Sequence, residues 1–186
     1  MRISKTDQQL IDQVRQGDTD SFKEIVGRYE PRVAATVISM LGNCSEADDV
    51  GQETFIRFFK SLKDFRGDSS IATYLTRIAI NLSLNELKRR KRRKLLFSQS
   101  TDSIENIIDE TEPEDFALKR IVNRAIQQLD PMFRAVLVLR LVVGYSTKET
   151  ADILKLPEGT VLSRLARAQK KLKSILTPLV GEKING

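Results

Sequence analysis

The stretch from Tyr145 to Lys173 constrains the fold more than any other part of the chain, because it has the pattern of two helices joined by a tight turn. Ser146, followed three residues later by Glu149, predicts a capping box at the start of the first helix. Pro157 predicts the end of that helix, because proline lacks an amide proton and disfavours helix at the residue before it. Thr160 is then expected to cap the second helix by accepting a hydrogen bond from a free amide.

The second helix of this pair has two different faces. Apolar residues recur along it at helical spacing and predict a buried stripe of Val161, Leu165, Ala168, Leu172 and Ile175. The opposite face carries Ser163, Arg164, Arg167, Lys170 and Lys171. A helix-turn-helix whose second helix is basic outside can offer that helix to the major groove of DNA. The alternative is an ordinary helical hairpin with a solvated basic face, since the motif has no unique chemical signature.

Composition excludes several kinds of chemistry. The chain of 186 residues has 31 lysines and arginines against 25 acidic residues, and its net charge of +6 favours a polyanionic partner. It has no histidine, which excludes His-based catalysis and His metal ligands. The single cysteine, Cys44, can form neither an internal disulfide nor a zinc cluster. We therefore expect no cofactor and no metal site.

Helical periodicity runs through the rest of the chain, and no strand-like alternation appears. Thr6 and Ser45 are expected to cap helices in the first half, and Ser69 or Ser70 is expected to open a long helix. No apolar run approaches the ~18 residues of a membrane span, and the N-terminus lacks a signal-peptide core. The expected location is the cytoplasm.

The distribution of charge divides the chain into three parts. Lys88–Lys94 is an unbroken basic run, for which a polyanionic partner is a better explanation than a solvated surface, because its like charges repel one another. Residues 98–115 are rich in Asp and Glu and contain Pro113 but no basic residue, which is typical of a linker. We predict an all-α fold of two small helical bundles, residues 1–97 and 116–186, joined by a flexible acidic linker. The second bundle contains the helix-turn-helix and ends in a frayed tail from Thr177.

Three groups of short motifs follow one another along the chain. The first group is Ala47–Val50 with Gln52–Phe55. The second group is Phe65–Asp68 with Thr73–Leu75, Arg77–Ala79 and Asn81–Leu82. The third group is Leu129–Pro131 and Arg134 with Gly159–Val161, Ser163–Arg164 and Arg167–Ala168. In this order and spacing they resemble the bacterial sigma factors of the extracytoplasmic-function group, group 4 of the sigma-70 family. The resemblance covers nearly the whole chain. It implies that the first group binds core RNA polymerase, the second reads and opens the −10 promoter element, and the third binds the −35 element.

The resemblance implies roles for individual residues. For binding core polymerase they are Asp48, Asp49, Gln52, Glu53, Phe55 and Arg57. For the −10 element they are Phe65, Arg66, Gly67, Tyr74, Arg77, Asn81, Arg89, Arg90, Lys91 and Arg92. For the −35 element they are Thr160, Ser163, Arg164, Arg167, Lys170 and Lys171. The purely structural alternatives are a local ion pair between Glu53 and Arg57, a core position for Phe65 and a plain surface position for Asn81.

Three residues depart from the family pattern. Tyr74 stands where the family usually has tryptophan, Thr150 where it usually has isoleucine, and Leu162 where lysine is frequent. Tyrosine can still stack on a base, whereas leucine removes a contact with a phosphate. These differences bear on promoter preference rather than on the class of function.

The resemblance implies three partners: core RNA polymerase through its β′ clamp and β subunit, promoter DNA, and an anti-sigma protein. The acidic linker would thread the RNA exit path of the polymerase. Because the phosphodiester chemistry belongs to the polymerase, the chain itself is not expected to be an enzyme. A stand-alone helix-turn-helix regulator is the alternative, but it leaves the pattern from Asp48 to Arg57 without a purpose. A nuclease or recombinase is disfavoured, because no second acidic cluster completes a metal site with Asp48 and Asp49.

Overall fold

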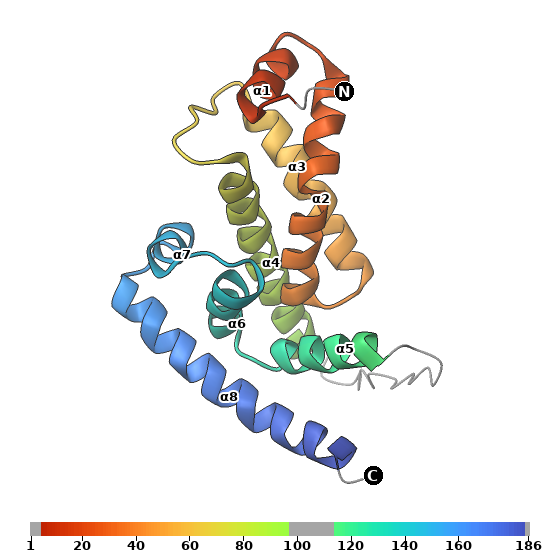
Figure 1. The fold of residues 1–186 in the computed structure, drawn as a ribbon, viewed down its shortest axis with the longest axis vertical. Helices are drawn as coiled ribbons and strands as arrows, with labels where there is room; N and C mark the ends of the chain where they lie inside the picture. The colour runs from red at the N-terminus through yellow and green to blue at the C-terminus, as the bar shows by residue number, and fades with distance from the viewer. Residues whose placement is uncertain (1–4, 97–113, 185–186) are drawn as a thin grey trace.

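The computed structural model describes residues 5–96 and 114–184, and over these ranges it contains helices and turns but no strand (Figure 1). The helices of the first half are α1 (Asp7–Arg15), α2 (Thr19–Leu41), α3 (Ser45–Ser61) and α4 (Ile71–Leu96). Those of the second half are α5 (Glu114–Gln127), α6 (Pro131–Leu137), the π-helical segment Val138–Val142, α7 (Thr147–Leu154) and α8 (Glu158–Ile184). The all-α prediction is confirmed for the described residues. Of the predicted linker, residues 98–113 lie outside them, and residues 114–115 are the first two of α5.

Local signals set most of the helix starts. Thr6 and Gln9 form a capping box at α1, in which the Thr6 hydroxyl accepts from the Gln9 amide at 3.3 Å and the Gln9 side chain accepts from the Thr6 amide at 2.8 Å. The Asp18 carboxylate accepts from the amides of Asp20 and Ser21 at the start of α2. Such side-chain acceptors satisfy amides that have no partner within the helix.

The predicted cap of α3 is wrong. Ser45 is the first residue of α3 rather than its cap, and Cys44 occupies the cap position without a side-chain hydrogen bond to the helix. The carbonyl of Cys44 already accepts from the Ala47 amide at 2.9 Å, so the helical bonding begins one residue earlier than the serine would require. At α4, by contrast, the Ser70 hydroxyl accepts from the Thr73 amide at 3.1 Å, as predicted.

The prediction that the tail frays from Thr177 is also wrong. Helix α8 continues through Thr177 and Pro178 to Ile184. The turn before the proline is held in place, because Leu172 and Ile175 pack against the core and α8 packs along α5. Within the described residues, no helix combines the length and the apolar character that crossing a membrane would require.

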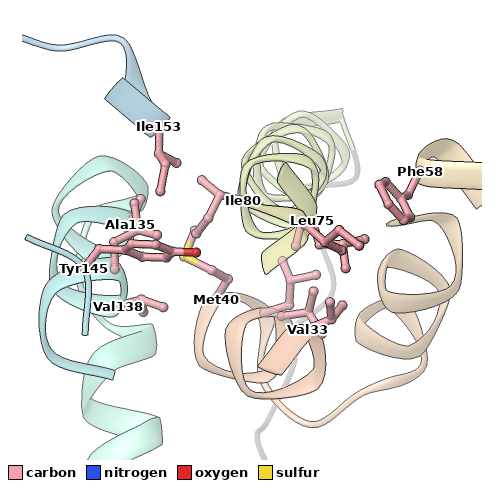
Figure 2. Close-up of a cluster of buried hydrophobic side chains, with 14 of the residues drawn as sticks. Val33, Met40, Phe58, Leu75, Ile80, Ala135, Val138, Tyr145 and Ile153 are labelled. Atoms are coloured by element: carbon pink, nitrogen blue, oxygen red, sulfur yellow. The ribbon is translucent and has the colours of Figure 1, made fainter. Parts of the chain in front are cut away.

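Helix α2 lies at the centre of the molecule and packs on α1, α3 and α4. One hydrophobic core runs from this first half into the second half. Figure 2 shows Met40 and Ile80 of the first half lying against Ala135, Tyr145 and Ile153 of the second. A smaller cluster of Val136, Ala151 and Val161 joins α6, α7 and α8. The two predicted bundles are therefore packed together, an arrangement that the sequence did not indicate.

Candidate nucleic-acid interface

Helix α3 presents a polar face to solvent. Its buried residues recur at helical spacing and are Ala47, Thr54 and Phe58. The exposed residues include four predicted polymerase-binding residues, Asp48, Asp49, Gln52 and Arg57. Glu53 and Arg57 form the local ion pair that was the structural alternative, with a nitrogen–oxygen distance of 2.7 Å. An exposed pair at this spacing is worth only ~0.3–0.5 kcal/mol, so it does not prevent either side chain from meeting a partner.

Apolar side chains on the same helix were missed by the sequence reasoning. Ile56 and Phe59 have exposed fractions of 46% and 47%. Phe59 is held by an edge-on contact with Phe22, whose ring centroid lies 4.8 Å away. Phe55, a predicted polymerase-binding residue, is instead half-buried against the core. Exposed apolar residues bordered by charged ones resemble the centre and rim of a protein interface. The sequence did contain a signal for this exposure, because Ile56 and Phe59 fall outside the buried stripe of α3.

The loop between α3 and α4 borders a cavity of about 310 Å³. This volume is at the lower end of the range for small-ligand sites. The predicted −10 residues in its lining are Phe65, Arg66, Gly67, Tyr74 and Arg77, and the others are Ser61, Asp64, Asp68 and Ser69. The structure thus brings together aromatic, cationic, anionic and hydroxyl groups from the loop and from the adjoining ends of α3 and α4.

Phe65 and Tyr74 belong to the cavity and to the core at once. Their ring centroids lie 5.2 Å apart, edge to face, and each lies 5.9 Å from the ring of Phe58. Arg15 of α1, which the sequence did not single out, donates to the carbonyl of Leu62 at 3.0 Å and to that of Phe65. The loop is therefore held in place by the packing of the Phe65 ring and by the guanidinium group of Arg15.

Helix α4 carries the remaining predicted −10 residues away from the cavity. Asn81 is exposed about one turn beyond Arg77 and does not line the cavity. The basic run Lys88–Lys94 lies in the last turns of α4, which extends to Leu96. Helical geometry spreads these cations around the axis, so that they do not all face the same surroundings.

Two carboxylates neutralise part of the basic run. Glu86 is buried and lies 2.8 Å from Arg89, 3.6 Å from Arg90 and 3.1 Å from Arg93. Glu46 of α3 lies 3.4 Å from Arg90 and 3.7 Å from Arg93. The pKa of Glu46 is lowered, mainly by its own backbone amide and then by Arg90.

The rest of the run remains open. The cations that are exposed and make no ion pair with another described residue are Lys88, Lys91, Arg92 and Lys94. Arg90 differs from them, because it also donates to the carbonyl of Leu41 at 3.0 Å and ties α4 to the end of α2. Adjacent residues in one charged stretch thus have different surroundings.

Helices α7 and α8 form the predicted helix-turn-helix. The predicted capping box is present, because the Ser146 hydroxyl accepts from the Glu149 amide at 3.2 Å and the Glu149 carboxylate accepts from the Ser146 amide at 2.8 Å. These bonds from Ser146 lower the pKa of Glu149. Lys155 ends α7 in the left-handed region, with φ of 53°, and turns the chain toward α8.

Thr160 does not cap the second helix, contrary to the prediction. Helix α8 begins at Glu158, and the amides of Thr160 and Val161 donate to the carbonyl of Pro157 at 2.9 and 3.1 Å. Proline is tolerated at this place, because its missing amide would have had no partner within the helix. Thr160 is therefore a half-buried residue of the first turn.

The outer face of α8 carries the other predicted −35 residues. Val161 and Ala168 are fully buried on the inner face, where α8 packs on α5, α6 and α7. The exposed residues are Ser163, Arg167, Lys170 and Lys171, and Arg164 is half-buried. The basic face thus points away from the helices that support it.

These surfaces offer contacts to other molecules. They comprise carboxylates on α3, an aromatic-lined cavity beside α4 and basic faces on α4 and α8. Across the part of the chain that the structure describes, no group of three or more His, Cys, Asp or Glu side chains is placed to hold a metal ion. The arrangement suits a protein partner and nucleic acid.

Comparison with known proteins decides the family. The RNA polymerase sigma-H factor of Pseudomonas aeruginosa is 34% identical to this chain over 98% of it and 100% of that protein. The chain belongs to the sigma-70 family. Family models for sigma-70 region 2 and sigma-70 region 4 match residues 25–93 and 119–172. The ECF RNA polymerase sigma-E factor of Escherichia coli K12 is 35% identical over 94% of the chain and 96% of that protein.

Two solved structures share the fold of this chain. The structure of CnrH in complex with the cytosolic domain of CnrY matches with a TM-score of 0.67 and 28% identity, over 92% of this chain and 97% of that one. The sigma factor RpoE of Bartonella quintana, solved with the anti-sigma factor NepR, matches with a TM-score of 0.69 at 22% identity, over 84% and 96%. The second comparison shows the fold alone.

Region 2 and region 4 of this sigma factor meet at the C-terminal end of α2. Arg134 of region 4 is only 6% exposed and donates to the carbonyls of Met40 in region 2 and of Gln127 and Leu129 in region 4, the last at 3.0 Å. Burial lowers the pKa of Arg134 to about 10. The carbonyls at a helix C-terminus carry partial negative charge, so a guanidinium is a suitable donor there.

Three further contacts hold the two regions against each other. Gly42 has φ of 90°, and a Cβ atom added there would lie 2.9 Å from the side-chain oxygen of Gln127. The Tyr145 hydroxyl donates to the Thr76 hydroxyl at 3.2 Å, and Arg32 lies over the Tyr145 ring, 5.0 Å from its centroid. Sequence reasoning identified none of these contacts, because each joins residues that are far apart in the chain.

Proposed function

We propose that this sigma factor binds core RNA polymerase and directs it to promoters that carry −35 and −10 elements. In this proposal residues 1–97 act on the polymerase and the −10 element, and residues 116–186 act on the −35 element. The observation that carries it is the presence on one chain of three separate surfaces with the chemistry each task needs. The relatives described as ECF RNA polymerase sigma factors support the same function.

The outer face of α3 is the proposed contact with the β′ clamp and β subunit. Asp48 and Asp49 offer exposed carboxylates to arginines of a partner, and charge-assisted hydrogen bonds of this kind are strong. Ile56 and Phe59 add the apolar centre on which most of the binding energy of an interface depends. Phe55 supports this face from below.

The cavity beside α4 is the proposed pocket for a base that leaves the −10 duplex. Flipping a base out of the stack costs a few kcal/mol, which a pocket must recover. Tyr74 and Phe65 provide aromatic surface, and stacking on such surface is worth ~1–3 kcal/mol per base. Arg66 and Arg77 can meet the phosphates next to that base, and Asn81 lies nearby for a neighbouring base edge.

The basic faces of α4 and α8 are the proposed contacts with the rest of the promoter. Lys91 and Arg92 would follow the DNA backbone, and phosphate contacts of this kind supply affinity but little sequence information. Ser163 and Arg167 would reach base edges of the −35 element, where arginine fits the O6 and N7 atoms of guanine. We also propose an anti-sigma protein as a regulatory partner, and we assign all bond-making to the polymerase.

Reconstituted transcription tests the proposal. The full chain is combined with core RNA polymerase, and duplex templates are selected from a randomised pool by the complex. We expect transcripts that require the chain and start at a fixed distance from the selected elements. A stand-alone regulator would select a duplex but give no transcript, and a nuclease would cut the template.

A further inference from the structure

Leu162 occupies an unusual position on the recognition helix. Among the described side chains of α8, it is the only large apolar one that is exposed, with an exposed fraction of 54%. Its neighbour Val161 is fully buried and holds the helix to α6 and α7. Leu162 therefore projects from the side of the helix that faces away from the core.

The residues around Leu162 leave it prominent. Gly159 lies one turn before it and Ala166 one turn after it, and both are exposed and small. A Cβ atom added at Gly159 would meet nothing within 4 Å. Ser163 and Arg167, two of the residues proposed to read the −35 element, border the same face. The leucine thus belongs to the surface that would enter the groove.

The chemistry of the major groove restricts what a leucine can meet there. Base-pair edges present hydrogen-bond donors and acceptors, and the apolar group among them is the 5-methyl group of thymine. A leucine placed on a donor or acceptor would remove water without replacing its hydrogen bond, which is unfavourable. Contact with a thymine methyl group instead buries apolar surface on both partners.

We propose that Leu162 reads the 5-methyl group of a thymine in the −35 element. The inference rests on the proposed function, because it requires the outer face of α8 to lie in the major groove. Leu162 then becomes a specificity-determining residue that prefers thymine at one position of the element.

Deoxyuridine provides the test, since it differs from thymidine only by the missing methyl group. The full chain with core polymerase first selects its duplex from a randomised pool, and each thymine of the selected upstream element is then replaced singly by deoxyuridine. For the unaltered chain we expect one position at which this change weakens binding roughly threefold to fivefold, the value of one buried methyl group. For L162A, the same change should have no effect at that position.

Leu141 supplies the matched control. It is as exposed as Leu162, at 54%, but lies on the π-helical segment rather than on α8. L141A should respond to deoxyuridine as the unaltered chain does. The inference is overturned if the selected upstream element contains no thymine, or if deoxyuridine affects L162A and the unaltered chain equally at every position. If no duplex is selected at all, the proposed function itself fails, so the two failures can be told apart.

Discussion

Arg90 and Lys91 are neighbours in one basic run, yet their surroundings differ completely. Arg90 is bonded to the Leu41 carbonyl and lies between Glu46 and Glu86. Lys91 is exposed and makes no ion pair with any residue that the structure describes. Part of the charge that suggested a polyanionic partner therefore stabilises the fold, and only the open part remains for nucleic acid.

The first prediction separates these two roles. R90A should lower the free energy of unfolding by ~1.5–3 kcal/mol, because it removes hydrogen bonds that involve a charged group. The double variant K91A/R92A should change stability by less than about 0.5 kcal/mol, but should reduce the slope of log binding constant against log salt by ~0.9 for each phosphate that the chain no longer neutralises. Thermal unfolding and salt titration of promoter binding measure the two effects. Equal unfolding temperatures for the two variants would contradict this division.

The second prediction concerns Asn81, whose side chain points to solvent rather than into the cavity. If its amide reads a base edge, N81A should reduce discrimination between −10 sequences by roughly threefold to tenfold, the value of one hydrogen bond. N85A removes an exposed amide about one turn further along α4 and serves as the control. Transcription from paired templates that differ at single −10 positions measures the discrimination. If N81A and N85A behave alike, Asn81 has no role in reading.

At the scale of single elements, helix α3 shows how one face can be open while the other supports the core. The third prediction is that D49K abolishes binding to core polymerase and leaves the unfolding temperature nearly unchanged, because Asp49 is exposed and has no ion pair with a described residue. E30K makes the same charge change at an exposed position of α2. Co-purification with core polymerase distinguishes them: E30K should be retained, and retention of D49K would remove α3 from the interface.

The capping box of α7 gives a pH dependence, which is the fourth prediction. Hydrogen bonds from Ser146 lower the pKa of Glu149 below its ordinary value of 4.5. A carboxylate with a lowered pKa stabilises the fold above its unfolded-state pKa, and this stability is lost as the pH falls through the folded-state pKa. In E149Q the glutamine side chain can still accept a hydrogen bond from the Ser146 amide, but it does not titrate. Its unfolding temperature should therefore fall less than that of the unaltered chain between about pH 5 and pH 3, as followed by circular dichroism.

Elements with local signals were predictable from the sequence. The cap at Thr6 and the capping box at Ser146 depend on residues within one turn, so the sequence alone placed them. The prediction for Thr160 was wrong because it also relied on a local preference. Threonine is a good cap residue, but the Pro157 carbonyl already accepts the first hydrogen bonds of the helix. The π-helical segment Val138–Val142 has no local signature, and its widened turn became visible only in the structure.

At the scale of the whole molecule, the closure of region 2 on region 4 was not predictable. The partners of Arg134 are main-chain carbonyls, which every residue has, so no side-chain pattern could identify them. The cavity was predictable in part, because the resemblance collected Phe65, Gly67 and Tyr74, but Arg15, which bonds to the carbonyl of Phe65, comes from a different helix. Long-range contacts of this kind depend on the packing of complete helices.

The closed arrangement also conflicts with simultaneous reading of both promoter elements. Tyr145, just before the eight-residue helix α7, is hydrogen-bonded to Thr76, and Thr76 lies beside the cavity. The start of α8 is then within about 40 Å of the cavity. This upper bound adds the length of α7, from its rise per residue, to the fully extended lengths of the connections before and after it. Elements at −35 and −10 are about 25 base pairs apart, or roughly 85 Å of duplex. Under the proposed assignment of the cavity to the −10 element and of α8 to the −35 element, the two regions therefore separate when both elements are bound.

The fifth prediction tests the closure directly. G42A and G17A both place alanine at a positive φ, 90° and 98°, where an L side chain is strained. Only at Gly42 would the added methyl group press on Gln127, since nothing lies within 4 Å of the corresponding atom at Gly17. Because the methyl group meets the movable end of the Gln127 side chain, small-angle X-ray scattering should show only a small increase in the radius of gyration of G42A relative to G17A. Identical radii would mean that this contact does not hold the regions together.

Tyr145 gives the closure a further, practical consequence. The chain contains three tyrosines and no tryptophan, so its intrinsic ultraviolet emission comes from phenol rings alone. One of these rings is buried between the two regions, under a guanidinium and bonded to a hydroxyl. Separation of the regions transfers that ring to water, which makes the unlabelled protein its own optical reporter of opening.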